Sequence, residues 1–189
     1  REDAVDAFTE EVVSRVGRMR AGNGLEEGVQ IGPLVDEAAV EKVERQVADA
    51  AGRGAEVLCG GHRMTDGALA KGTFYAPTVL SGVAPDMQIY REETFGPVAP
   101  IIPFRDEGEA LAMANDTHYG LASYVYTRDM AKAFRMFEDL KFGIVGINDI
   151  NPTAAAAPFG GSKESGLGRE GGHEGIAEYL ETKLGGFSI

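Results

Sequence analysis

Apolar residues recur at steps of three and four positions in several stretches of this chain, which is the spacing that places them on one face of an α-helix. The first such stripe consists of Val5, Phe8, Val12, Val16 and Met19. With the later stripes included, the pattern predicts helices over residues 2–20, 36–52, 107–115, 128–140 and 174–180. Asp36 lies where the second helix would begin, and an aspartate there can cap the first turn.

Short runs rich in β-branched and aromatic residues alternate with these helices. They predict strands over residues 56–59, 74–80, 98–104, 124–126, 142–147 and 182–189. The run from Val98 to Phe104 is nearly all apolar, which is typical of a strand covered on both faces in a parallel sheet. Pro77 suggests that the second run is irregular or lies at a sheet edge. Strands that alternate with helices predict the α/β class, with βαβ units and a mostly parallel sheet.

Residues 148–169 form the longest stretch without a helical or strand pattern, because prolines and glycines interrupt it. Loops longer than about 12 to 15 residues are usually either functional or disordered. We expect this loop to be functional.

The composition excludes several classes of function. With 189 residues and a net charge of -12, the chain has the length of one domain and lacks the basic patches that nucleic acid or an anionic membrane would require. No apolar run reaches the roughly 18 residues that span a bilayer. The single cysteine, Cys59, excludes an internal disulfide. We therefore expect a cytoplasmic protein with neither nucleic acid nor membrane as a partner.

The segment from Glu92 to Pro97 places two carboxylates and an aromatic ring directly before the central apolar run. Ligands of open α/β sheets bind at strand ends, where Glu93 and Phe95 would suit a polar, flat ligand. The alternative is a helix that ends in acidic residues, followed by a turn with Phe95 packed inward.

Two blocks of sequence carry a resemblance to a known family. Residues 92–98, Glu-Glu-Thr-Phe-Gly-Pro-Val, resemble the E-E-x-F-G-P-V signature of the aldehyde dehydrogenase superfamily, and residues 158–170 resemble its P-F-G-G-x-K-x-S-G-x-G-R-E segment. Weaker similarities lie at residues 31–34, 74–80 and 115–121, in the family's order. The chain is therefore identified as a member of that superfamily.

The resemblance implies how the chain is organised. Residues 1–180 would be the C-terminal part of the catalytic domain, and residues 181–189 a strand that joins subunits of a homo-oligomer. The dinucleotide-binding domain would lie upstream, together with the nucleophilic cysteine and the base glutamate of the family. Cys59 lies in a segment unlike the family's nucleophile segment, so we interpret it as a small core or strand-end residue, and this chain contains no catalytic residue.

The resemblance also implies a cofactor, NAD or NADP. Glu93 aligns with the glutamate that accepts hydrogen bonds from the nicotinamide ribose, and a carboxylate suits a diol because both oxygens are acceptors. Phe95 aligns with the ring that packs near the nicotinamide. Glu92 is interpreted as structural or solvated.

Two residues of the long loop are candidates for binding an aldehyde substrate. Phe159 aligns with an aromatic residue of the family's aldehyde pocket, with packing under the Gly160-Gly161 turn as the alternative. The second half of the loop is similar to succinate-semialdehyde dehydrogenases, in which a serine helps to bind the substrate carboxylate. Thr153 stands at that position and keeps the hydroxyl. The implied reaction is therefore oxidation of succinate semialdehyde to succinate.

Other interpretations of the chain remain open. The substrate would be another aldehyde, such as a betaine or aliphatic aldehyde, or the chain would be a non-catalytic fragment with a scaffolding or oligomerisation role. Arg169 and Glu170 are interpreted as a structural ion pair or cap, and Lys163 as an anchor of the loop. The three histidines lack the spacing of metal ligands, so no metal site is predicted.

Overall fold

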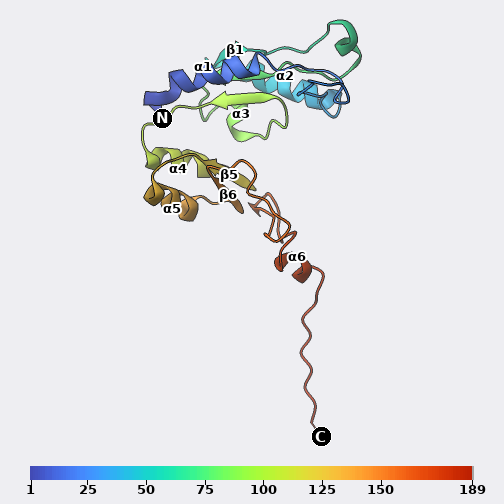
Figure 1. The fold of residues 1–189 in the computed structure, drawn as a ribbon, viewed down its shortest axis with the longest axis vertical. Helices are drawn as coiled ribbons and strands as arrows, with labels where there is room; N and C mark the ends of the chain where they lie inside the picture. The colour runs from blue at the N-terminus through green and yellow to red at the C-terminus, as the bar shows by residue number, and fades with distance from the viewer. Residues whose placement is uncertain (189) are drawn as a thin grey trace. The chain divides into compact units, whose positions relative to one another are not determined.

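The computed structural model describes residues 1–188, which form two compact units, one from Arg1 to Arg105 and the other from Asp106 onward (Figure 1). Each unit contains its own helices and its own paired strands. Within residues 1–188, no helix is both long enough and apolar enough to cross a membrane.

The first unit combines helices with one three-stranded sheet. Its elements are α1 (Val5–Val16), α2 (Glu37–Gly52), β1 (Glu56–Cys59), β2 (Thr78–Ser81), α3 (Gln88–Arg91) and β3 (Val98–Ile101), with 3-10 helices at Glu2–Ala4 and Gly67–Lys71. The strand order is β1-β2-β3, with β1 antiparallel to β2 and β3 parallel to it. The short helix α3 lies where the alternative interpretation placed a helix that ends in acidic residues, although a single turn shows no apolar periodicity.

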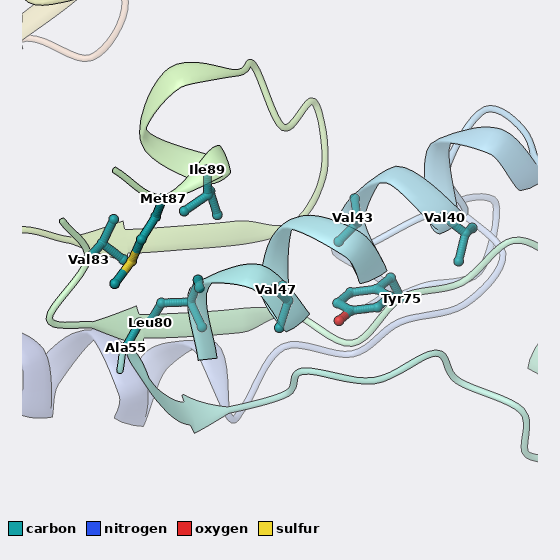
Figure 2. Close-up of a cluster of buried hydrophobic side chains, with 10 residues drawn as sticks. Val40, Val43, Val47, Ala55, Tyr75, Leu80, Val83, Met87 and Ile89 are labelled. Carbon is teal, nitrogen blue, oxygen red and sulfur yellow. The ribbon is translucent and has the colours of Figure 1, made fainter. Parts of the chain in front are cut away.

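Helix α2 forms as the sequence predicts and carries the core of this unit. The Asp36 carboxylate accepts a hydrogen bond of 2.8 Å from the Ala39 backbone N–H, which caps the first turn. The apolar face of α2 packs on residues of the strands and of the α3 region, in a cluster drawn in Figure 2. The cluster consists of Val40, Val43, Val47, Ala50, Ala55, Tyr75, Leu80, Val83, Met87 and Ile89. Full burial of one such valine contributes about 1.5 to 3 kcal/mol, so this face fixes α2 on the sheet.

Helix α1 is shorter than predicted, and part of its apolar stripe is exposed. It ends at Val16, and two members of its apolar stripe stay exposed, Phe8 by 59% and Met19 by 41%. A groove of about 560 Å³ separates part of α1 from the sheet and is lined by Ser81 among others. Leu80, the neighbouring residue of β2, packs in the cluster beneath α2. Because successive residues of a strand face opposite sides, α1 and α2 cover opposite faces of the sheet.

Two strand predictions need correction. The predicted strand 98–104 ends at Ile101, and Pro100 is exposed, because β3 is an outer strand of this sheet in residues 1–188. The edge position suggested for residues 74–80 is wrong, because β2 begins directly after Pro77 and is the central strand. A proline just before a strand removes no hydrogen bond from the ladder.

The second unit contains a βαβ motif and a small antiparallel pair. Its elements are α4 (Glu107–Asn115), β4 (Tyr119–Gly120), β5 (Ala122–Val125), α5 (Met130–Asp139), β6 (Ile144–Ile147), β7 (Ser162–Lys163) and α6 (Glu174–Ala177). Strands β5 and β6 pair in parallel and are joined through α5, as predicted, whereas β4 and β7 are antiparallel. The α/β class with parallel strand pairs is confirmed, and the antiparallel pairings make the sheets mixed.

The predicted C-terminal strand is not formed in this chain. Residues 181–188 have no regular secondary structure, and the side chains of Leu184 and Phe187 are 96% and 93% exposed. A strand requires a neighbour to satisfy its backbone groups, and no other strand of the described residues pairs with this segment. Ile189, the last residue of the prediction, lies outside the described residues.

The cap of α2 gives a first prediction. The substitution Asp36→Ala removes the acceptor for the Ala39 N–H and should lower the free energy of unfolding by about 1 kcal/mol. Asp36→Asn keeps a side-chain oxygen and should lower it by much less. Chemical denaturation of both variants measures the difference, and equal losses would mean that the cap does not stabilise α2.

Candidate functional site

The turn from Glu92 to Pro97 joins α3 to β3 and is tied to the rest of the unit at both ends. The Glu92 N–H donates to the Gln88 carbonyl at 2.9 Å, which closes α3. The Pro97 carbonyl accepts from the Thr78 N–H at 2.8 Å, next to the first residue pair of the β2–β3 ladder. Both ends of the turn are therefore held by hydrogen bonds, and its middle residues lie at the surface.

Phe95 points outward because of its backbone conformation. Its φ angle of 47° lies in the left-handed region, and its side chain is 75% exposed. This conformation costs a non-glycine residue on the order of 1 to 3 kcal/mol. Gly96 helps to impose it, because a Cβ at that position would come within 2.7 Å of the Val43 side chain on α2. The alternative in which Phe95 packs inward is wrong.

Glu93 lies beside Phe95 with an exposed carboxylate. Its backbone carbonyl accepts a hydrogen bond of 3.2 Å from Lys42 Nζ, whereas its carboxylate has no hydrogen-bond partner within residues 1–188. Two free carboxylate oxygens can accept hydrogen bonds from a pair of neighbouring hydroxyl groups. Together with an exposed ring, they fit a ligand that combines a diol with a flat group.

Glu92 is exposed to solvent and its carboxylate also contacts α2. Its Oε2 atom lies 3.5 Å from the Gln46 Nε2 donor, a long hydrogen bond, so the structural interpretation of Glu92 is supported. Sequence patterns did not indicate Lys42 or Gln46. Both are separated from the turn by about 50 residues, and no local signal reports so distant a contact.

The second unit contains a cavity of about 170 Å³ at the start of the long loop. It is lined by Gly143, Ile144, Val145, Pro152, Thr153, Ala157, Pro158 and Phe159. The structure therefore brings the two predicted residues Thr153 and Phe159 into one cavity wall. The contribution of residues 143–145 was missed, because a strand pattern does not reveal which loop will pack against it.

In this cavity the Thr153 hydroxyl is hydrogen-bonded, whereas the Phe159 ring is accessible. Thr153 Oγ1 donates to Asn151 Oδ1 at 2.7 Å, and both residues lie on the loop itself. Phe159 is 40% exposed, and its backbone is paired with that of Glu170 at 2.6 and 2.7 Å. The backbone of Phe159 is thus fixed, and its ring remains accessible to a small molecule.

Arg169 holds the hairpin that contains Phe159. Its Nη1 atom donates to the carbonyl oxygens of Gly161 and Gly168, both at 2.7 Å. Arg169 is therefore structural, as predicted, but it bonds to backbone carbonyls and not to Glu170. Lys163 anchors the loop as predicted, since its Nζ donates to the Thr117 carbonyl at 3.1 Å.

Cys59 ends β1, where its sulfur lies 4.0 Å from the Pro77 carbonyl and is only partly accessible. This position agrees with its interpretation as a strand-end residue. Residues 1–188 contain no group of three or more histidine, cysteine or acidic residues arranged to hold a metal ion.

Ion pairs account for shifted pKa values elsewhere in the two units. A hydrogen bond from Arg53 lowers the pKa of Asp49 on α2, and one from Arg135 lowers the pKa of Glu107 at the start of α4. Burial raises the pKa of Tyr75 to about 12. These groups hold helices against their neighbours and do not line the two candidate sites.

The two candidate sites lie in an α/β fold, and comparisons with known proteins specify its family. The model of the aldehyde dehydrogenase family matches residues 1–184. The chain belongs to the aldehyde dehydrogenase family, which confirms the interpretation of the two sequence blocks.

Its relatives include several semialdehyde dehydrogenases. The glutarate-semialdehyde dehydrogenase of Pseudomonas putida is 50% identical over 94% of this chain and 36% of the relative. The NADP(+) succinate-semialdehyde dehydrogenase of Escherichia coli strain K12 is 49% identical, again over 94% of this chain and 36% of the relative. The chain thus spans little more than a third of the length of these curated relatives.

Solved structures agree with this result. The betaine aldehyde dehydrogenase of Staphylococcus aureus in complex with NAD+ matches with a TM-score of 0.92 and 40% identity, over 97% of this chain and 36% of the other. The succinate-semialdehyde dehydrogenase of Burkholderia pseudomallei matches with a TM-score of 0.88 and 48% identity, over 93% and 36%.

The packing of the loop on β6 gives a second prediction. A Cβ at Gly143 would overlap the Gly160 carbonyl, so Gly143→Ala should displace the loop beside Phe159 and destabilise the protein by about 1 to 3 kcal/mol. Gly24→Ala is the matched control, because nothing lies within 4 Å of a Cβ there. Denaturation midpoints compare the two variants, and equal stability would show that the loop does not pack closely on Gly143.

Proposed function

We propose that this chain supplies the nicotinamide-ribose contacts and part of the aldehyde pocket of an NAD(P)-dependent aldehyde dehydrogenase. The observation that carries the proposal is the pair formed by the unpaired Glu93 carboxylate and the outward Phe95 ring. Family membership and the NAD+ complex of the Staphylococcus aureus relative support the choice of cofactor.

Each residue of the turn has a distinct task in this proposal. When bound, the nicotinamide cofactor supplies the hydride acceptor for oxidation of an aldehyde to a carboxylic acid. Glu93 accepts hydrogen bonds from the ribose hydroxyls through both carboxylate oxygens. Phe95 packs beside the nicotinamide and limits its motion, which favours a reactive geometry. The choice between NAD and NADP is left open by this chain's residues.

The aldehyde pocket is the second part of the proposal. Phe159 provides an apolar wall, and the Thr153 hydroxyl provides a donor for a substrate carboxylate once its hydrogen turns away from Asn151 Oδ1. Two relatives that are about 50% identical act, by their names, on glutarate semialdehyde and on succinate semialdehyde, which favours a semialdehyde that ends in a carboxylate. A neutral or cationic aldehyde is the second candidate, supported by the betaine aldehyde dehydrogenase at 40% identity.

The nucleophile and the base are proposed to lie in a part of a longer protein that precedes this sequence. Cys59 is partly covered at a strand end, where its sulfur lies 4.0 Å from the Pro77 carbonyl oxygen, whereas reactive cysteines are more accessible. We also propose that residues 181–188 become a strand when a second subunit offers an edge, since Leu184 and Phe187 are exposed here. The chain alone would then be inactive.

The cofactor contact leads to a third prediction, tested on the full-length protein that contains this chain. Glu93→Gln and Phe95→Ala should each raise the dissociation constant for NADH or NADPH by about 10-fold, because each removes part of the ribose or ring contact. Fluorescence titration of the reduced cofactor measures this without turnover. Glu41→Gln removes an exposed carboxylate from α2 and should change nothing. Unchanged binding in both turn variants would refute the proposed cofactor site.

Turnover of the 189-residue chain and of the full-length protein tests the rest of the proposal. The substrates are succinate semialdehyde, glutarate semialdehyde, betaine aldehyde and acetaldehyde, with either cofactor. Only the longer protein should be active, with a preference for the semialdehydes. Activity of the chain alone would mean that the nucleophile lies within it, with Cys59 as the candidate. An inactive full-length protein would favour the scaffolding alternative.

A further inference from the structure

Between α1 and α2 the chain folds into a closed loop over residues 20–31 (Figure 1). A parallel bridge joins Ala21 to Ile31, and the Gly22 N–H donates to the Ile31 carbonyl at 3.0 Å. These contacts close the neck of the loop without using the residues at its tip, 23–26. The tip is exposed to solvent.

The tip begins with the dipeptide Asn23-Gly24. Asn23 Oδ1 accepts a hydrogen bond of 3.1 Å from the Leu25 N–H. Within residues 1–188, the side-chain nitrogen of Asn23 makes no hydrogen bond, and neither does the Gly24 N–H. Nothing lies within 4 Å of the position that a Cβ of Gly24 would occupy. The amide nitrogen of Asn23 and the next backbone nitrogen are therefore both without a partner, in a part of the loop where no neighbour restricts them.

We propose that Asn23 is a modification site, at which deamidation in the folded protein produces aspartate and isoaspartate. The Gly24 nitrogen loses its proton to a base and forms a bond to Asn23 Cγ. The Cγ–Nδ2 bond breaks, and the side-chain nitrogen takes up a proton and leaves as ammonia. The Leu25 N–H stabilises the negative charge that develops on Oδ1 during the attack.

Water completes the reaction by opening the succinimide ring that the attack has formed. Cleavage of the bond between Cγ and the Gly24 nitrogen gives aspartate. Cleavage of the bond between the Asn23 main-chain carbonyl carbon and the same nitrogen gives isoaspartate. Neither step needs an oxidant or a reductant, and the inference is independent of the proposed function.

The other three asparagines of the chain lack this combination of features. Asn115 and Asn148 each use both polar atoms of the side-chain amide in hydrogen bonds of 2.8 to 3.0 Å with main-chain groups. Asn151 precedes Pro152, whose nitrogen carries no hydrogen and cannot lose a proton to become the attacking group. In residues 1–188, Asn23 alone combines an amide nitrogen without a partner with a following glycine.

The reaction would change the tip of the loop and leave its neck intact. Aspartate adds a negative charge to a loop that already carries Glu26 and Glu27. Isoaspartate inserts an extra carbon atom into the main chain. The Leu25 hydrogen bond and the bond of 2.9 Å from the Glu26 N–H to the Asn23 carbonyl cannot then keep their geometry. We expect a looser tip and an unchanged denaturation midpoint.

The experiment incubates the full-length protein that contains this chain in neutral and in mildly alkaline buffer. In a tryptic digest, the peptide from Ala21 to Lys42 contains Asn23 as its single asparagine. Mass spectrometry measures the replacement of NH2 by OH, with a sample taken before incubation as the correction for the digest. Conversion of Asn23 should be about tenfold faster at a pH one unit higher, because the attacking nitrogen must lose a proton.

The other asparagines serve as internal controls. Asn115 and Asn148 should convert about tenfold or more slowly than Asn23, because both hydrogen bonds of each amide must first break. An Asn23 amide that stays intact in the folded protein would overturn the inference. Conversion of Asn115 or Asn148 at the rate of Asn23 would overturn it as well.

Gly24→Ala is the matched variant, because its added methyl group meets no atom of the folded loop. It should slow the conversion of Asn23 by about tenfold or more, since alanine restricts the backbone conformations that permit the attack. An equal rate in this variant would overturn the proposed route. A glutamate-specific protease should cut the incubated protein severalfold faster than fresh protein at Glu26 and Glu27. Equal cutting would contradict a change at the tip.

Discussion

The packing of α2 on the three-stranded sheet is the interaction on which the first unit depends. Its buried valines fix the helix above β2, and the same helix then determines where the chain between α3 and β3 can run. Val43 shows this double use. Val43 belongs to the core cluster and also closes the space behind Gly96. The core therefore extends without interruption to the base of the candidate cofactor turn.

The packing of α2 helps to explain the strained backbone conformation of Phe95. A phenylalanine whose backbone adopts the left-handed conformation is unfavourable by itself, and this conformation persists only where the surrounding residues leave no alternative. The turn is bonded at Glu92 and at Pro97, and Gly96 is pressed against α2. With both ends fixed, the ring has no route into the core. An outward aromatic beside a free carboxylate is then a consequence of the packing, and it is also what a flat, hydroxylated ligand requires.

The sequence predicted the elements whose information is local. The stripe from Val40 to Ala50, the cap at Asp36 and the βαβ unit around α5 are all confirmed, because spacing and capping act within a few residues. The length of α1 was predicted wrongly, since the apolar stripe continues to Met19 whereas the helix ends at Val16. The C-terminal strand stays a prediction, because a strand needs hydrogen-bonding neighbours and none of the described strands pairs with residues 181–188.

In the candidate site, too, sequence motifs identified some residues, whereas contacts between distant residues became visible only in the structure. Glu93, Phe95, Thr153 and Phe159 were identified through family resemblance, and the structure adds how they are held. Residues about 50 positions away hold the turn, and a guanidinium group that bridges two carbonyls holds the loop with Phe159. The contacts of Lys42 and Gln46 carry no sequence signature, whereas Arg169 belongs to a family segment and was interpreted as structural from it. Candidate ligand-binding residues can thus be recognised from a motif, whereas distant residues that contact the same turn become visible only when the chain is folded.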